Sequence, residues 1–361
     1  MRKEEWMRKA FSLAKKGIGK IVNEPLNSLL LVQGDETLFF WNHDGKHRLD
    51  EAIDHHSIKQ GGVLYLPYEP EMNPKLLLWI LNSSVISIEI SQLNRIEPNR
   101  FVEWAKANKI EVNVGLLKDE GFNLNEIYFH RLTSPYPFIT LSFGMSLDGK
   151  IATYTGDSKY ISGNESLAFV HQLRHEHQAI LVGINTVLID HPKLTTRLEK
   201  IKGRDPIKII LDSTLKINLD EPLFTSSKAK TIIVTKKDTC PEKKNTLIKM
   251  GVKIIEVEDK SSPMNIKEIL LKLRNEGIES LLVEGGGTIH FSFVKERLFN
   301  RIYATVSPMI IGGESAKTAV SGQGFKTLKE AAKLKFTQVN LYGKDYIIEA
   351  VLDEENSEEK K

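Results

Sequence analysis

The sequence contains almost no cysteine. Across 361 residues there is a single one, Cys240. One cysteine cannot close an internal disulfide or supply a cysteine-rich zinc site, so a disulfide-stabilised scaffold and a cysteine zinc finger are both excluded. Residues 1–6 are charged and lack the apolar core of a secretion signal. We therefore expect a protein of the reducing cytoplasm.

Long apolar runs and an excess of one charge are also missing. The densest apolar run, residues 76–81, is far shorter than the ~18 residues that cross a bilayer, so no membrane span is predicted. The 50 Lys and Arg residues nearly balance 47 Asp and Glu, which leaves a net charge of +3. This balance gives no electrostatic case for nucleic-acid binding.

What the sequence does contain is two stretches in which helical and strand-like patterns alternate, as in α/β domains. The first covers residues 1–131 and the second 138–352, and the proline-containing segment 132–137 is the predicted linker. Residues 353–361 are almost all charged and are expected to be a solvated tail. The second stretch ends in two segments of period-two alternation, 336–341 and 346–351, which predict an antiparallel hairpin. Its earlier buried-strand patterns are 138–143, 179–183, 207–212, 231–235, 252–257 and 280–283.

Three clusters in the second stretch are candidates for binding chemistry. The first, Ser-Leu-Asp-Gly-Lys-Ile-Ala at 146–152, follows a predicted strand directly. Ligands commonly bind at the carboxyl ends of strands in open α/β sheets. A plain turn at Asp148-Gly149 is the alternative interpretation.

The second cluster is the long segment 183–197, which also follows a predicted strand and is rich in hydroxyl groups. We expect a loop here, because the segment is longer than a simple connection requires and long loops are often functional. It carries Asp190 and Arg197, and an arginine in such a place can hold a phosphate with two parallel hydrogen bonds. A solvated surface loop is the alternative.

The third cluster is 281–290, where a buried strand ends in Glu284 and is followed by Gly285, Gly286 and Gly287. Glycine backbone N–H groups at the start of a helix can bind phosphate. The glycines are consecutive, so this is not the spaced fingerprint of dinucleotide-binding folds. A tight turn with no ligand is the alternative.

Taken in order, these motifs resemble the reductase domain of the riboflavin-biosynthesis deaminase–reductase family. The resemblance covers residues 137–352. Besides the three clusters it includes Gly-Asp-Ser-Lys-Tyr-Ile-Ser at 156–162, an H-x-x-R helix end, and Pro-Met-Ile-Ile-Gly-Gly at 308–313. It implies a dihydrofolate-reductase-like domain that binds NADPH. It also implies reduction of the ribose of a phosphoribosylamino-pyrimidine to a ribityl chain by a homodimer or tetramer.

The resemblance also assigns roles to residues, although it names no catalytic side chain. Its NADP-contacting positions fall on Gly144, Tyr160, Thr186, Asp190, Ser213 and the stretch 286–292 with Gly286, Gly287 and Thr288. Its substrate-contacting positions fall on Ser158, Arg174, Leu194, Arg197 and Glu284. Chemically, both arginines suit the substrate's 5′-phosphate and Glu284 suits its sugar hydroxyls.

Two positions depart from the family pattern, and the residues that would bind the 2′-phosphate of NADPH are not assigned by it. Ser142 stands where a lysine is common, and Tyr160 replaces a tryptophan while keeping an aromatic face. Thr235, Lys236 and Lys237 are candidates for the 2′-phosphate of NADPH, with solvated lysines as the alternative.

The first stretch resembles the family's zinc-dependent deaminase domain but lacks its ligands. The H-x-E position reads Leu49-Asp50-Glu51, and the cysteine region at 67–71 reads Pro-Tyr-Glu-Pro-Glu. Deamination of this kind needs zinc to activate water and a glutamate to move protons. A zinc site rebuilt from nearby histidines is the alternative to exposed histidines on a retained scaffold. The histidines concerned are His43, His47, His55 and His56.

We therefore expect no zinc and no deaminase activity, and a structural role for this domain in shielding, oligomerisation or binding a separate deaminase. The leading hypothesis is an NADPH-dependent reductase of 5-amino-6-(5-phosphoribosylamino)uracil. The rival within the same class reduces the undeaminated 2,5-diamino-6-ribosylamino-pyrimidinone phosphate. A non-catalytic nucleotide-binding or regulatory protein is the alternative from another class.

Overall fold

The computed structural model describes residues 2–21, 23–46, 49–54, 61–159, 161–199, 203–258 and 264–353. The chain divides into two compact units, Met1–Thr133 and Ser134–Lys361. The last helix of the first unit ends at Thr133, and the first strand of the second begins at Phe138. Within the described ranges no helix is long and apolar enough to cross a bilayer.

In the described part of the first unit, five strands form one sheet in the order β2-β1-β3-β4-β5. β1 runs antiparallel to both of its neighbours, whereas β3, β4 and β5 are parallel. The strands are β1 Ser28–Gln33, β2 Glu36–Asn42, β3 Val63–Tyr68, β4 Ser87–Gln92 and β5 Glu111–Val114. The helices are α1 Lys3–Ala14, α2 Leu49–Asp54, α3 Pro74–Asn82, α4 Arg100–Ala107, α5 Lys118–Leu124 and α6 Glu126–Thr133, with a 3-10 turn at Lys15–Gly17.

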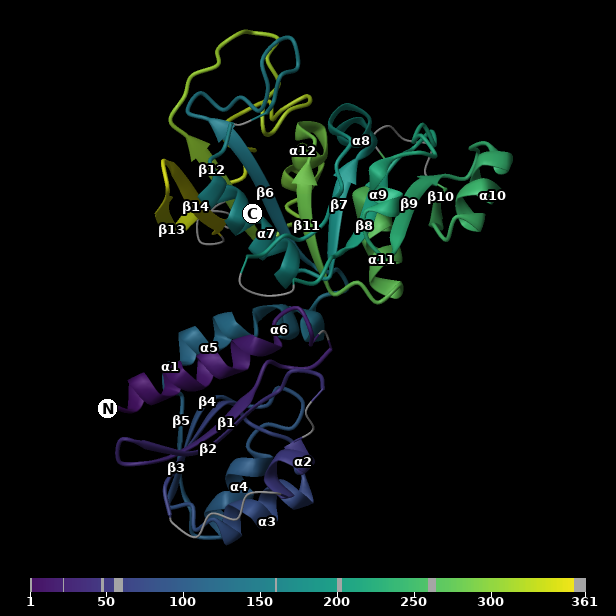
Figure 1. Ribbon diagram of the computed structural model, residues 1–361. Helices are drawn as coiled ribbons and strands as arrows, with labels where there is room; N and C mark the ends of the chain where they lie inside the picture. The colour runs from purple at the N-terminus through teal and green to yellow at the C-terminus, as the bar shows by residue number, and fades with distance from the viewer. Residues whose placement is uncertain are drawn as a thin grey trace. The chain divides into compact units, whose positions relative to one another are not determined.

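Helices cover both faces of this sheet, as Figure 1 shows. Alternate side chains of β1 divide between two apolar clusters: Leu29 and Leu31 pack with α3 and α4, and Leu30 packs with α1. α1 fits its face because its buried residues recur at helical spacing. Those residues are Trp6, Met7, Ala10, Phe11 and Ala14.

In the described part of the second unit, nine strands form one sheet in the order β10-β9-β8-β7-β11-β6-β12-β14-β13. All neighbours are parallel except β12–β14 and β14–β13. The strands are β6 Phe138–Ser146, β7 Ala179–Gly183, β8 Ile207–Leu211, β9 Thr231–Lys236, β10 Lys253–Val257, β11 Ser280–Gly285, β12 Arg301–Ser307, β13 Leu334–Tyr342 and β14 Asp345–Leu352. The helices are α7 Asn164–Glu176, α8 Ile184–Asp190, α9 Pro222–Thr225, α10 Pro241–Lys249, α11 Ile266–Asn275 and α12 Gly287–Lys295.

The central strands of this sheet are buried on both faces, which explains their continuous apolar runs. In β7, Leu181 packs with α11 and α12 on one side, while Ile180 and Val182 pack with α8, α9 and α10 on the other. α11 begins at the cap residue Asn265, whose side chain accepts from the N–H groups of Lys267 and Glu268.

The predicted α/β class and the C-terminal hairpin are confirmed. β13 pairs antiparallel with β14, and Tyr342 faces Asp345 across the turn at Gly343. The loop expected over 183–197 is wrong in its first half, because Ile184–Asp190 forms the helix α8. The buried side chain of Val187 packs against the apolar cluster on this face of the sheet, and this tertiary contact stabilises the short helix.

Candidate active site

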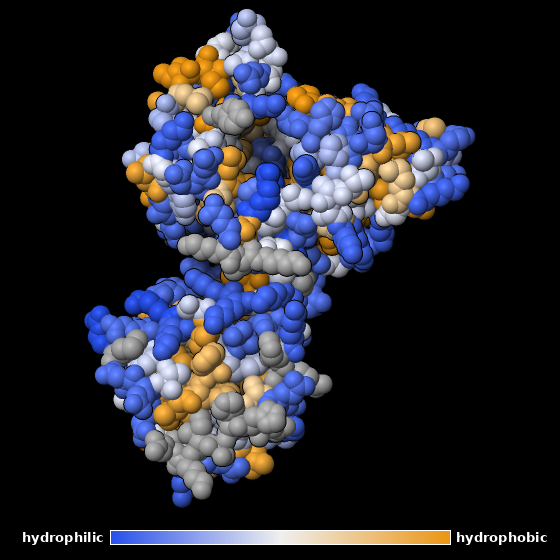
Figure 2. Space-filling view, viewed as in Figure 1, coloured by the Kyte–Doolittle hydropathy of each residue, from blue (hydrophilic) through white to orange (hydrophobic). Residues whose placement is uncertain are grey.

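The candidate site lies in the second unit at the carboxyl ends of the parallel strands β6, β7 and β11. β11 ends in Glu284 and Gly285, and α12 begins two residues later at Gly287. Ligands of open α/β sheets bind at this edge. Figure 2 shows that the surface between β6 and α12 is hollowed and that hydrophilic residues lie at its floor.

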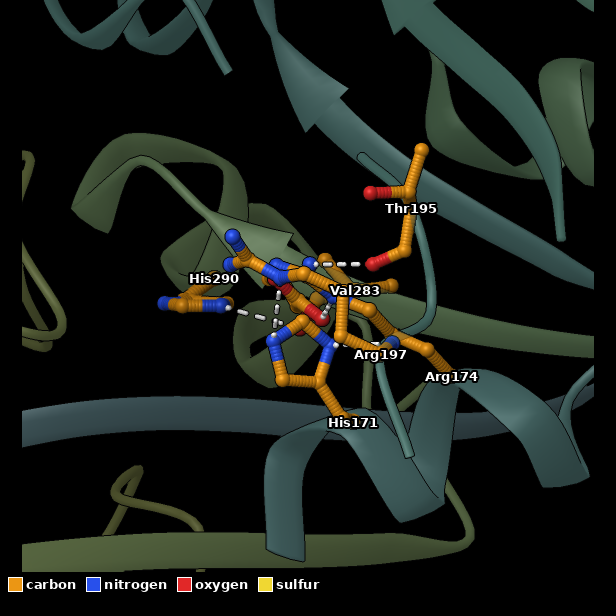
Figure 3. Close-up of polar contacts among 7 residues, drawn as sticks. His171, Arg174, Thr195, Arg197, Val283 and His290 are labelled. Atoms are coloured by element: carbon orange, nitrogen blue, oxygen red, sulfur yellow. Dashed lines mark hydrogen bonds and ion pairs between the residues drawn. The ribbon is translucent and has the colours of Figure 1, made fainter. Parts of the chain in front are cut away.

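Glu284 is held by a two-point ion pair with Arg174 of α7. The Arg174 Nε lies 2.7 Å from Oε1 and its Nη2 lies 2.6 Å from Oε2. The third nitrogen, Nη1, donates to the Thr195 carbonyl at 2.9 Å, so the guanidinium also fixes the chain after α8 (Figure 3). Burial lowers the pKa of Arg174, but the Glu284 carboxylate raises it more, and the result lies above the ordinary value. Both side chains are only 12–15% exposed, so the pair is largely shielded from water.

One helical turn before Arg174, the His171 imidazole lies against Arg197. The Arg197 Nε is 3.2 Å from Nε2 of the ring, and the Arg197 backbone N is 3.3 Å from Nδ1 (Figure 3). Burial, and then the neighbouring Arg174 and Arg197 charges, lower the pKa of His171 to about 4. At neutral pH this ring is uncharged. His171 was not among the predicted site residues; the only sequence signal for it is its H-x-x-R spacing to Arg174.

The segment after α8 is positioned by its own hydrogen bonds. Leu194 is buried and has a φ of 52°, a left-handed conformation that reverses the chain. Thr196 then donates its backbone N–H to Asp205 at 2.7 Å. At the end of α8, the Ser158 hydroxyl lies 3.5 Å from Asp190 Oδ1, so these two predicted site residues are neighbours.

The glycine-rich turn has steric reasons for its composition. Gly286 has a φ of +67°, and a Cβ on Gly287 would lie 2.5 Å from the Thr318 carbonyl oxygen and 2.5 Å from Ser321 Oγ. The turn is thus packed tightly against the segment 318–321, and Ser321 donates its N–H to the Gly287 carbonyl. Thr186 Oγ1 would lie 3.4 Å from a Cβ on Gly285, which places that predicted residue beside the turn.

The first predicted cluster, 146–152, anchors a second loop at the same sheet edge. Asp148 accepts from Ser146 Oγ at 2.6 Å and from the N–H groups of Ile311 and Gly312 at 3.0 and 2.7 Å. These hydrogen bonds lower the pKa of Asp148 to about 2. The Ser-Leu-Asp-Gly turn therefore holds the glycine-containing segment 308–313 in place.

Gly144 is also explained by close approach, because a Cβ there would lie 2.6 Å from Ser162 Oγ. Ser142, at the position where the family commonly has a lysine, is buried in β6 opposite Tyr303 of β12. Tyr160 lies outside the described residues.

Of the residues predicted near the adenosine half, Ser213 follows β8, whereas Thr235 and Lys236 end β9 and Lys237 comes directly after it. Ser213 accepts from the Lys236 backbone N–H at 3.4 Å. The Lys237 ammonium lies 3.2 Å from Glu258, and Thr235 is buried. Lys237 is thus already paired with a carboxylate.

The first unit has a cavity of about 820 Å³ at the carboxyl ends of β3 and β4, lined among others by Trp41, His43 and Asp50. Glu69 at its edge is fully buried, and its carboxylate accepts from four backbone N–H groups, two of them in the first turn of α4. His43 lies 2.7 Å from Glu24. Among the described residues, no three His, Cys, Asp or Glu side chains gather as a metal site would require. His47, His55 and His56 lie outside the described residues.

The chain is similar to known proteins over most of its length. The RibD C-terminal domain family matches residues 137–348. The riboflavin biosynthesis protein RibD of Actinobacillus pleuropneumoniae is 32% identical over 96% of this chain and 95% of its own length. The 2,5-diamino-6-ribosylamino-4(3H)-pyrimidinone 5′-phosphate reductase of Methanothermobacter thermautotrophicus is 36% identical over 59% of this chain and 97% of its own.

Solved structures share the fold over nearly the whole chain. A diaminohydroxyphosphoribosylaminopyrimidine deaminase/5-amino-6-(5-phosphoribosylamino)uracil reductase from Thermotoga maritima superposes with a TM-score of 0.81 at 26% identity. The superposition covers 97% of this chain and 98% of that one. The RibD of Acinetobacter baumannii gives a TM-score of 0.80 at 22% identity, with the same coverage of both chains.

Proposed function

The chain belongs to the RibD family of riboflavin-pathway reductases, and from this premise we propose that it reduces 5-amino-6-(5-phosphoribosylamino)uracil with NADPH and has no deaminase activity. In this reaction the ribose of the substrate becomes a ribityl chain. The substrate must then come from a separate hydrolytic deaminase.

The observation that carries the proposal is the fixed carboxylate of Glu284 beside two arginines. A sugar phosphate needs acceptors for its hydroxyl groups and a cation for its phosphate. Glu284, at the end of β11, is held by its ion pair with Arg174 of α7. The exposed side chain of Arg197 contacts His171, which lies one turn before Arg174 on the same helix. We assign Glu284 to the ribose hydroxyls and Arg197 to the 5′-phosphate.

The residues around the glycine-rich turn fit a nicotinamide dinucleotide. A helix that begins just after a glycine of positive φ presents backbone N–H groups to an anion without side-chain obstruction, as a pyrophosphate requires. Gly144, Thr186, Asp190, Ser213, Gly286, Gly287 and Thr288 are the residues we assign to the cofactor. When bound, NADPH supplies the hydride for C1′ of the ring-opened sugar; the chain's part is to bind, orient and exclude water.

The absence of deaminase activity is proposed from the first unit. The positions that carry zinc ligands in deaminases of this type hold Leu49 in α2 and Glu71 after β3. A leucine cannot donate to zinc, and a single carboxylate is short of the ~3 protein ligands that a catalytic zinc needs. We propose that this unit is a retained scaffold without zinc.

Reduction of the undeaminated pyrimidine is the second candidate. It is favoured by relatives named as 2,5-diamino-6-ribosylamino-4(3H)-pyrimidinone 5′-phosphate reductases, two of which are 36% and 34% identical over 59% of this chain. The two substrates differ at one ring position, where a single donor or acceptor can decide the preference.

We propose that a second copy of the chain covers the outer strand of the second unit. β13 is the edge strand of its sheet, yet Phe336, Val339 and Leu341 are 54–65% exposed. Edge strands with exposed apolar side chains commonly mark interfaces. This supports the expected homodimer or tetramer.

The experiment is a product analysis with matched variants. The purified full chain is incubated with NADPH and the deaminated substrate, and mass spectrometry should detect a product two hydrogens heavier than the substrate. Glu284→Ala should abolish this product, whereas Glu258→Ala, at a carboxylate paired with Lys237, should not. No reduced product from the unaltered chain would overturn the proposed function.

A further inference from the structure

Arg174 and Arg197, which sequence reasoning placed together on the phosphate, differ sharply in their surroundings. All three nitrogens of the Arg174 guanidinium are engaged, by Glu284 and by the Thr195 carbonyl. Arg197 is exposed, and in the described part of the structure its Nη1 and Nη2 atoms have no hydrogen-bond partner. Arg197 is therefore the guanidinium that can take up an anion without breaking an existing ion pair.

The Arg197 side chain is oriented by the His171 ring. Its Nε–H can donate to Nε2 of the imidazole at 3.2 Å. Two Arg197 donors face the ring, the backbone N–H at Nδ1 and the Nε–H at Nε2, and a neutral imidazole has one acceptor nitrogen. The tautomer with its proton on Nδ1 is the one that accepts from the side-chain Nε–H, and it leaves the backbone N–H without an acceptor on the ring. Two nitrogens of the Arg197 guanidinium, Nη1 and Nη2, are then left to bind a ligand. They can donate two parallel N–H hydrogen bonds to an incoming phosphate.

We propose that His171 is a positioning residue that, as a neutral acceptor, aims the Arg197 guanidinium at the substrate phosphate. The inference rests on the proposed function and adds to it a residue that sets affinity for the phosphorylated substrate. His171 itself does not contact the reacting sugar carbon in this account.

The groups around His171 keep it neutral. Arg174 on its own helix and Arg197 on the facing segment both disfavour a positive ring, as burial does; Glu284 on β11 and the Thr195 carbonyl act the other way. Protonation would remove the acceptor for the Arg197 Nε–H and would bring two cations together. We therefore expect affinity for the phosphorylated substrate to hold at neutral pH and to fall as the pH drops toward 4.

The test compares two substitutions at His171. His171→Phe keeps a flat ring but has no acceptor, whereas His171→Gln keeps an acceptor oxygen. His171→Phe should raise KM for the phosphorylated substrate about five- to tenfold, the effect of losing one such hydrogen bond, and change kcat much less. His171→Gln should restore most of the affinity. With substrate from which the phosphate has been removed, His171→Phe should have far less effect on kcat/KM.

A double variant and a binding measurement separate the possible failures. In an Arg197→Ala background, His171→Phe should raise KM no further. Equal effects of Phe and Gln, or equal effects on both substrates, would overturn the positioning role while leaving reductase activity established.

If the unaltered chain reduced neither substrate, the proposed function would fail on its own. The His171–Arg197 contact could still be tested by NMR titration of the imidazole, with inorganic phosphate as the anion. A midpoint near the ordinary 6.5 rather than about 4 would contradict the geometry. So would a midpoint that phosphate leaves unchanged, since a bound phosphate anion raises it.

Discussion

Replacing Arg174 by methionine should destabilise the second unit by about 3–5 kcal/mol, the usual result of removing one partner of a buried ion pair. The pair meets that condition because its side chains are only 15% and 12% exposed. Methionine fills most of the volume but leaves the Glu284 carboxylate without its two hydrogen bonds and leaves the Thr195 carbonyl without its donor. The loss of stability therefore comes mainly from the unpaired Glu284 carboxylate rather than from an empty space where the arginine was.

The assay is urea unfolding of the full chain, followed by circular dichroism. Because the chain has two compact units, the transition that belongs to Ser134–Lys361 should move to lower urea while that of Met1–Thr133 stays in place. The double variant Arg174→Met with Glu284→Leu should recover most of the lost stability, since a buried pair replaced by apolar groups is often neutral. It should remain inactive, because the carboxylate for the sugar hydroxyls is gone.

A loss of less than about 1 kcal/mol in the free energy of unfolding of Arg174→Met, the value typical of an exposed pair, would contradict a buried ion pair. Additive losses from Arg174→Met and Glu284→Leu would contradict it as well. Additivity would mean that the side chains act independently, against the direct contacts between them.

Three further predictions concern the loops and the first unit. Gly287→Ala should lower the free energy of unfolding by about 1–3 kcal/mol and raise KM for NADPH, because the added Cβ would overlap the Thr318 carbonyl. Steady-state kinetics would measure this KM, and an unchanged value would contradict the prediction. Asp148→Ala should speed amide hydrogen exchange at Ile311 and Gly312, which donate to that carboxylate. In the unaltered chain the same protection should be present above about pH 4 and be lost as the pH falls through about 2, because the folded-state pKa lies below the ordinary one. Zinc or a zinc chelator should leave the reductase rate unchanged, and a rate that follows zinc would overturn the scaffold interpretation of the first unit.

Sequence alone predicted the periodic parts of this chain well. Continuous apolar runs such as 179–183 and the alternation in 346–351 correspond to β7 and β14, because burial on two faces and on one face leave different patterns. α8 was missed, since it is only seven residues long and Val187 is its one buried residue, so it shows no helical repeat of apolar positions. Short helices of this kind are stabilised by tertiary contacts that no local pattern reveals.

The site was predicted in part, for a similar reason. Motif spacing pointed to Glu284, Arg174 and Arg197 as polar groups at strand and helix ends. It could not show that Glu284 occupies the Arg174 guanidinium, which depends on the packing of α7 against β11. It also could not show that His171 contacts Arg197, which depends on the packing of α7 against the segment after α8. Equal roles for the two arginines were the natural expectation from chemistry alone.

One paired measurement tests whether this chain reduces the deaminated pyrimidine and has no deaminase activity of its own. NADPH oxidation is followed with the deaminated substrate and with its amino precursor side by side, and ammonia is assayed in the same samples. We expect NADPH oxidation with the deaminated substrate and no ammonia from either. Oxidation with the amino precursor alone would assign the chain to the other order of reactions, and ammonia release would contradict the account of the first unit.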